Sequence, residues 1–167
     1  FVLLVLALAD MQRLRTNERL TVIYLLDQSL SIPAEQREAM VEYAIRSVAK
    51  HRDQDREDRA GVIVFGRDAR VEVPPLDDQL PITGKLEAAF DMQKDATNMA
   101  AALKLAQASF AEDSARRIVV ITDGNENLGD SQSVARMLSE SGIAFDTVPI
   151  ELTARGEVSV DKVALPE

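Results

Sequence analysis

The sequence predicts an α/β fold, in which a doubly wound, mostly parallel central sheet carries one antiparallel edge strand and helices on both faces. Stretches of strand length alternate with stretches of helical periodicity along the 167 residues, a length that suits one domain. The central strand-like stretches are apolar throughout, as strands covered on both faces require. One pair of strands is joined by a turn so short that the two must be antiparallel.

The first half of the chain supplies three strands and one helix. Pro33 favours a helix that begins there, because proline suits the first helical position. The run 51–59 mixes both charges and predicts a solvated loop. Pro74-Pro75 predicts that the third strand lies at the sheet edge and ends there. The three strands span residues 20–26, 61–65 and 69–73.

The second half continues the alternation. Residues 76–97 contain Pro81, Gly84 and scattered charges, which predicts a loop with at most one short helix. The remaining elements are a helix after Asn98, a strand over 116–122, a helix from a Ser131 cap to Gly142, a strand over 144–150 and an edge strand over 158–163. The helix that follows Ser131 is expected to bury Val134, Met137 and Leu138.

Three regions are expected along the chain. Residues 1–17 form an apolar segment and a linker, 18–151 form the folded domain, and 152–167 form an edge strand and an exit toward further domains. The nine apolar residues Phe1–Ala9 are either the end of a transmembrane helix, which needs about 20 residues, or a short buried element. Arg13, Arg15 and Arg19 favour the first alternative, with the domain anchored beside a membrane on an undetermined side.

Composition excludes several functions. The formal net charge is -9 and no basic stripe with interleaved aromatic residues is present, so nucleic acid is not an expected partner. The chain has no Cys and one His, which rules out disulfides, thiolate zinc sites and histidine-rich metal sites.

Oxygen-bearing side chains follow the first strand. Asp27, Ser29 and Ser31 alternate along an extended segment, so their side chains point to one side at the mouth of the sheet. Oxygen atoms alone suit a hard cation such as Mg2+. A helix cap at Ser31 and a phosphatase nucleophile at Asp27 are alternative explanations of these residues taken alone.

Two later segments add oxygen ligands at the same edge. Asp123 ends a second apolar strand, and Thr97 precedes a helix. In open α/β sheets, ligands bind outside the carboxyl ends of the strands where the strand order switches.

The pattern Asp27-x-Ser29-x-Ser31, then Thr97-Asn98, then Thr122-Asp123-Gly124 resembles the metal-ion-dependent adhesion site (MIDAS) of von Willebrand factor type A (VWA) domains. The resemblance covers roughly residues 18–151 and implies the Rossmann-like fold of that family, as in its bacterial membrane-anchored members. It implies one Mg2+ or Mn2+, with Ca2+ a weaker candidate, held in part through water. The implied ligands are Asp27, Ser29, Ser31, Thr97 and Asp123.

The ligand types indicate what the site does. Only two of the five candidate ligands are carboxylates, so a divalent cation there stays electrophilic and accepts an external carboxylate. We therefore expect a non-enzymatic module that binds an Asp or Glu of a protein partner. The alternatives are a Mg2+-dependent phosphoryl-transfer enzyme and a metal-free scaffold. Against phosphatase chemistry, Ser29 stands where the haloacid-dehalogenase pattern places a general acid.

Overall fold

The computed structural model describes residues 19–82 and 86–150. Its strands are β1 (Leu20–Asp27), β2 (Arg59–Phe65), β3 (Ala69–Leu76), β4 (Ala115–Thr122) and β5 (Ile143–Pro149). They form one sheet in the order β3-β2-β1-β4-β5, in which only the β2–β3 pair is antiparallel. The mostly parallel sheet with one antiparallel edge strand is therefore confirmed.

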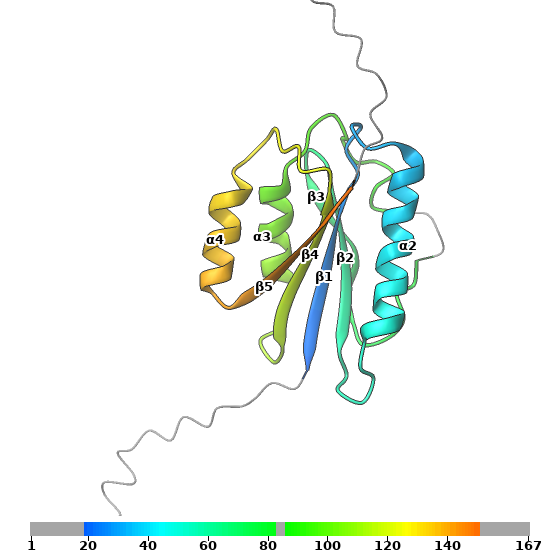
Figure 1. The fold of residues 1–167 in the computed structure, drawn as a ribbon, viewed down its shortest axis with the longest axis vertical. Coiled ribbons are helices and arrows are strands. Elements are labelled where there is room, and N and C mark those ends of the chain that lie inside the picture. Colours follow the sequence, from blue (N-terminus) through cyan, green and yellow to red (C-terminus); the bar gives the residue numbers. More distant parts are fainter. Residues whose placement is uncertain (1–18, 83–85, 151–167) are drawn as a thin grey trace, which may run out of the picture.

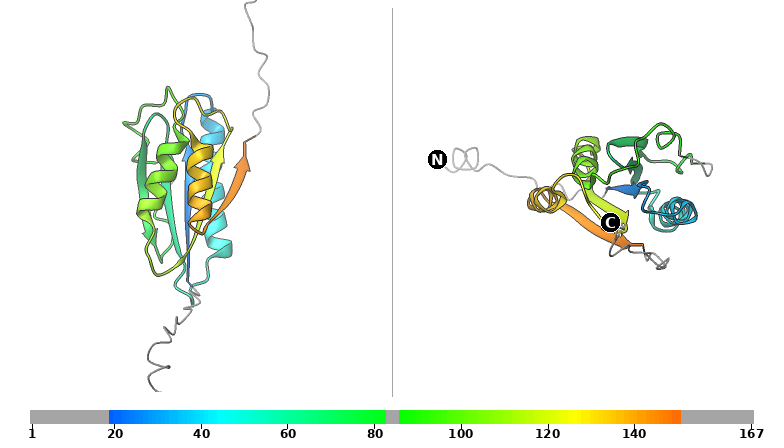
Figure 2. Two further views of the ribbon diagram at one scale, coloured as in Figure 1. Left: turned by 90° about the vertical axis from the view of Figure 1, so that its left-hand side faces the viewer. Right: turned by 90° about the horizontal axis from the view of Figure 1, so that it is seen from above.

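Helices cover both faces of this sheet, as predicted. The helices are α2 (Ala34–His51), α3 (Met99–Ser109) and α4 (Ser131–Glu140). α2 lies on one face, and α3 and α4 lie together on the other (Figures 1 and 2).

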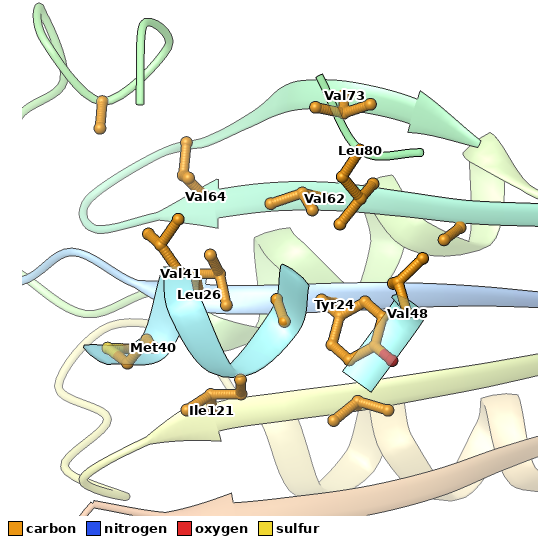
Figure 3. Packing of buried hydrophobic residues seen from close by; sticks show 14 of the residues in the cluster. Tyr24, Leu26, Met40, Val41, Val48, Val62, Val64, Val73, Leu80 and Ile121 are labelled. Carbon is orange, nitrogen blue, oxygen red and sulfur yellow. The ribbon is translucent and has the colours of Figure 1, made fainter. Parts of the chain in front are cut away.

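The alternation of side chains along β1 divides the core into two layers. Tyr24 and Leu26 point toward α2, whereas Ile23 and Leu25 point toward α3 and α4. All four are buried, which explains why β1 is apolar throughout. Figure 3 shows the α2 layer, where Val41 and other aliphatic side chains of the helix pack against the sheet.

The order of the strands places a switch point between β1 and β4. The chain leaves β1 through α2 toward β2, and enters β4 through α3 on the opposite face. β1 and β4 are parallel neighbours, with Leu26 beside Ile121, so both carboxyl ends reach the same edge. This edge is where a ligand site is expected in a doubly wound sheet.

Two predictions of local structure at helix starts were wrong by one residue. Pro33 is the N-cap of α2 rather than its first helical residue, because its ψ of 150° is extended. Ser131 is the first residue of α4, and the cap is Asp130, whose side chain accepts a hydrogen bond from Ser133 N. The alternative explanation of Ser31 as a helix cap does not hold, because α2 has no side-chain cap hydrogen bond.

Other predictions also need correction. β3 continues through Pro74-Pro75 to Leu76, which an edge strand tolerates because its outer N–H groups need no partner. Met137 is 48% exposed, since it lies at the border of the buried face of α4. Residues 86–98 contain turns and no helix, which agrees with the predicted loop.

The run 51–59 is not simply a solvated loop. Asp58 is buried, and its carboxylate accepts hydrogen bonds from Leu20 N and Asp53 N. Arg19, interpreted as part of a membrane-flanking basic cluster, forms ion pairs with Glu57 and with Asp113.

Some expectations fall on residues outside the described part of the chain. These are the segment 1–17, the exit 152–167 and the predicted strand 158–163. Among the helices of residues 19–82 and 86–150, none has the length and apolar character to cross a membrane.

Candidate metal site

Asp27 closes β1 and anchors the candidate site. Its carboxylate is fully buried, and each oxygen has a neutral donor. Ser29 N donates to Oδ1 at 2.9 Å, and the Thr122 hydroxyl donates to Oδ2 at 2.7 Å. The first bond turns the chain back at the strand end, as Asp side chains do in Asx turns. The second ties the end of β1 to the end of β4.

The two serines of the motif lie together. The hydroxyls of Ser29 and Ser31 are 2.9 Å apart and hydrogen-bonded. Ser29 is buried and Ser31 is exposed, so the pair leads from the interior to the surface. Arg37 supports this turn from α2, since its Nη1 donates to Gln28 O at 3.3 Å and Ser29 O at 3.4 Å.

Thr97 reaches the same place from the segment before α3. It is buried, and its N–H donates to Asn127 Oδ1 at 2.9 Å. Its carbonyl accepts from the N–H groups of Asn127 and Leu128 at 3.3 and 3.2 Å. The β4–α4 loop therefore holds the backbone of Thr97, and the hydroxyl is left free of this network.

Asp123 follows β4 directly. Its Oδ1 accepts a hydrogen bond from Asn125 N at 3.0 Å, which shapes the loop. Its Oδ2 is buried and has no hydrogen-bond partner within the described residues. A buried carboxylate oxygen without a partner is costly, and a cation or a water bound to a cation would satisfy it.

The five candidate ligands lie at the same edge of the sheet, and three of them share one hollow. Ser29, Ser31 and Thr97 line one hollow of about 320 Å³ at the carboxyl edge of the sheet. Asp27 adjoins them through Ser29, and the negative charge of Asp123 acts on Asp27. Asn125 and Asn127 of the β4–α4 loop line the same hollow.

The negative charges of Asp27 and Asp123 lie close together at this edge of the sheet. Burial raises the pKa of Asp27, and the nearby Asp123 charge raises it further, against the lowering effect of the Ser29 and Thr122 hydrogen bonds. No Lys, Arg or His of residues 19–82 and 86–150 forms an ion pair with Asp27 or Asp123. Two neighbouring carboxylates thus lack a protein cation.

Three other acids near the site have structural partners instead. Asp95 forms a bidentate pair with Arg67, at 2.9 and 2.7 Å. Glu126 accepts hydrogen bonds from the first turn of α3 and the start of α4. Asp130 caps α4. The sequence suggested only loop solubility for these three, because their partners are distant in the chain or are backbone N–H groups.

Sequence reasoning gave no role to Thr122 or to Asn127. Thr122 belongs to the Thr122-Asp123-Gly124 motif, and its hydroxyl donates a hydrogen bond to the Asp27 carboxylate, 95 positions away in the chain. Asn127 orients Thr97 and lay in a loop with no recognisable pattern. Among the described residues, no three His, Cys, Asp or Glu side chains cluster closely enough to hold a metal.

A doubly wound sheet with carboxylates and hydroxyls gathered at its switch point defines the class of α/β ligand-binding domains. Within this class, the model of the von Willebrand factor type A domain matches residues 22–126, and the chain belongs to that family. Domains of this family typically mediate protein–protein interaction and are generally not enzymes. No curated protein matches the sequence.

Solved structures agree with this assignment. An aerotolerance-related membrane protein from Bacteroides fragilis is 27% identical, with a TM-score of 0.64, over 84% of this chain and 75% of that one. BatB from Bacteroides thetaiotaomicron is 30% identical, with a TM-score of 0.66, over 78% and 66%. Proximal thread matrix protein 1 of the mussel byssus, with a zinc-occupied MIDAS motif, shares the fold at 20% identity, a TM-score of 0.58 and coverage of 77% and 37%.

Proposed function

We propose that this domain binds a protein partner through a divalent cation held by Asp27, Ser29, Ser31, Thr97 and Asp123. The observation that carries the proposal is the buried carboxylate of Asp27 beside the half-buried carboxylate of Asp123 at the switch point. The pair has no cationic partner among the described residues, and one oxygen of Asp123 is unsatisfied. A divalent cation would neutralise both carboxylates and supply the missing interaction.

The donor set favours Mg2+ or Mn2+, with Ca2+ a weaker candidate. All five side chains offer oxygen, which suits hard cations. None of the five is a thiol or an imidazole, which would favour a softer cation. The zinc-occupied MIDAS of the mussel byssus protein supports a divalent cation at this place in the fold. The hydroxyls of Ser29 and Ser31 would turn their lone pairs toward the cation.

The neutral ligands determine what the cation would do. Because three of the five ligands are neutral hydroxyls, the cation stays electrophilic enough to accept one more anionic oxygen. Ser31 and the surrounding hollow are open to the surface, so an Asp or Glu of another protein can reach this position. The role proposed for the cation is therefore adhesion rather than catalysis.

Calorimetric titration with Mg2+ or Mn2+ tests the metal site. We expect saturable binding by the wild-type protein and loss of binding in Asp123→Asn, which removes the charge of the carboxylate with the unsatisfied oxygen. Asp27→Ala should also abolish binding, although it removes two hydrogen bonds of the fold as well.

Asp95→Asn is the matched control. Asp95 lines the same hollow, but its carboxylate is engaged by Arg67, so its removal should change the affinity for Mg2+ by no more than a few-fold. Absence of saturable binding by the wild type, or equal loss in Asp95→Asn and Asp123→Asn, would contradict the proposed ligand set.

We also propose that the protein is attached to a membrane through residues 1–9, which precede a linker over 10–17. The support is the apolar sequence Phe1–Ala9 and the similarity to an aerotolerance-related membrane protein. Alkaline extraction of membranes from cells that make the natural protein tests this. We expect the protein to remain in the membrane pellet, and its complete release would contradict the anchor.

A further inference from the structure

Two strongly exposed apolar side chains are carried by segments that meet beside the candidate metal site. Phe90 is 87% exposed and Leu30 is 69% exposed, more than any other large apolar side chain in the described part of the chain. The segments that carry them are joined, because Leu30 N donates to Lys94 O at 2.9 Å. Single exposed apolar residues are common, but two beside a candidate ligand site indicate a contact surface.

A second hollow of about 260 Å³ lies beside the first, and Lys94 lines both. Its lining comes from α2, from the segment 86–94 and from Gln28 after β1. Phe90, Ala89 and Val41 contribute apolar surface to it. The hollow therefore continues the candidate metal site along the surface.

A buried donor without an acceptor lines this second hollow. Gln28 is 4% exposed, and its Nε2 atom has no hydrogen-bond partner within residues 19–82 and 86–150. The backbone of Gln28 is fixed by a hydrogen bond from its N–H to Phe65 O at 2.8 Å. A buried amide N–H that lacks an acceptor is unfavourable, and an acceptor oxygen of a ligand would satisfy it.

The charged groups of this hollow favour the same kind of ligand. Arg37 and Lys94 line it, against the single carboxylate of Glu38. Lys94 forms no ion pair among the described residues. Partial burial and the charge of Arg37 lower the pKa of Lys94, and a bound carboxylate would relieve that repulsion. A local excess of positive charge stands out in a chain of net charge -9.

We propose that this hollow is a second recognition site for the same protein partner, which receives an additional Asp or Glu side chain next to the one that ligates the cation. The second carboxylate accepts hydrogen bonds from Gln28, Arg37 and Lys94, and an apolar partner side chain packs on Phe90. This inference rests on the proposed metal-dependent function. It gives the partner segment a definite chemistry: two acidic residues and one apolar residue close together.

Capped synthetic nonapeptides with a central Glu test the inference. Each flanking position is changed in turn to Glu, Lys, Leu or Ser, and binding to the protein is measured by fluorescence polarisation with Mg2+ and with chelator. We expect Mg2+-dependent binding that strengthens about fivefold when a second Glu occupies one particular position. Lys at that position should weaken binding.

Lys94→Glu should remove the preference for the second Glu, and Phe90→Ser should remove any preference for Leu. The matched control is Lys104→Glu, which makes the same charge change on α3, on the opposite face of the sheet; it should keep both preferences. Equal affinity for Glu and Lys at every flanking position would overturn the second site. If the protein binds Mg2+ in calorimetry but binds none of the peptides, the proposal of an acidic partner is wrong and the proposed metal site is not contradicted. Absence of Mg2+ binding would overturn both.

Discussion

At the scale of single residues, Gly66 determines how Thr97 reaches the candidate site. A Cβ atom on Gly66 would lie 2.7 Å from Gln93 O, and the Gly66 carbonyl accepts a hydrogen bond from Asn98 N at 2.7 Å. The end of β2 and the segment before α3 are therefore in direct backbone contact. Only glycine allows this approach.

Gly66→Ala should destabilise the domain by about 1–3 kcal/mol and also weaken Mg2+ binding, because the segment that carries Thr97 must move. Urea unfolding and calorimetry measure the two effects. Gly142→Ala is the control: it strains a φ of +80° at the end of α4 without a clash, at a cost of about 1–2 kcal/mol. It should leave Mg2+ affinity unchanged, and an equal loss of affinity in both variants would argue against the specific role of Gly66.

At the scale of elements, Glu126 joins two helix starts to the candidate site. Its Oε1 accepts from Ala100 N at 3.1 Å, and its Oε2 accepts from Ser131 N at 2.9 Å. Both N–H groups belong to helix starts that lack helical acceptors, and the negative charge suits the positive ends of the two helix dipoles.

Glu126→Gln should therefore destabilise the domain by about 1–3 kcal/mol, because an amide offers one acceptor oxygen and leaves one helix N–H unpaired. Thermal and urea unfolding measure this loss. Glu112→Gln, an exposed position after α3, is the control and should change stability by less than about 0.5 kcal/mol. Equal stability of Glu126→Gln and the wild type would show that water replaces the lost acceptor.

A second prediction at this scale concerns the opposite edge of the sheet. Asp113, before β4, binds Arg59 of β2 at 2.9 Å and Arg19, before β1, at 2.6 Å. The Arg59 hydrogen bond, aided by the charges of Arg59 and Arg19, lowers the pKa of Asp113 below its ordinary value of 3.8. A lowered folded-state pKa stabilises the fold above the unfolded-state pKa, and this stability is lost as the pH falls through the folded-state value.

The wild type should therefore be more stable than Asp113→Asn at pH 7, and the difference should close as the pH falls below about 4. Urea unfolding across this range measures it. Asp55→Asn is the control, since Asp55 forms no ion pair among the described residues. A stability difference for Asp113→Asn that does not change with pH would contradict the ion-pair explanation.

The elements also show what a sequence can predict. β1 and β4 were identified because both are short apolar runs followed by an acid. The full set of five candidate ligands was implied by the resemblance to the VWA metal site, and convergence of strand ends alone pointed only to the edge of the sheet. The role of Glu126 could not be predicted, since its partners are backbone N–H groups of two helices. The second hollow escaped prediction because residues 86–94 have no periodicity, and only the fold places them against α2.

At the scale of the whole molecule, the distribution of charge explains why a cation should matter to stability. The chain carries a net charge of -9, and two carboxylates are close together at the switch point of its sheet. Without a cation this pair opposes folding, because the Asp27 charge must be desolvated close to the charge of Asp123. A cation that binds only the native state removes this penalty and adds its own binding free energy.

Mg2+ should therefore raise the melting temperature of the domain. At 100 times the dissociation constant, a native-state ligand adds about 2.7 kcal/mol, which corresponds to roughly 5–10 °C for a chain of this size. Differential scanning calorimetry with Mg2+, with chelator, and with NaCl at matched ionic strength separates specific binding from screening of the net charge. Asp123→Asn should lose the Mg2+ effect and keep the NaCl effect. Equal rises with Mg2+ and NaCl would instead support the metal-free scaffold, in which the acidic pair is merely screened.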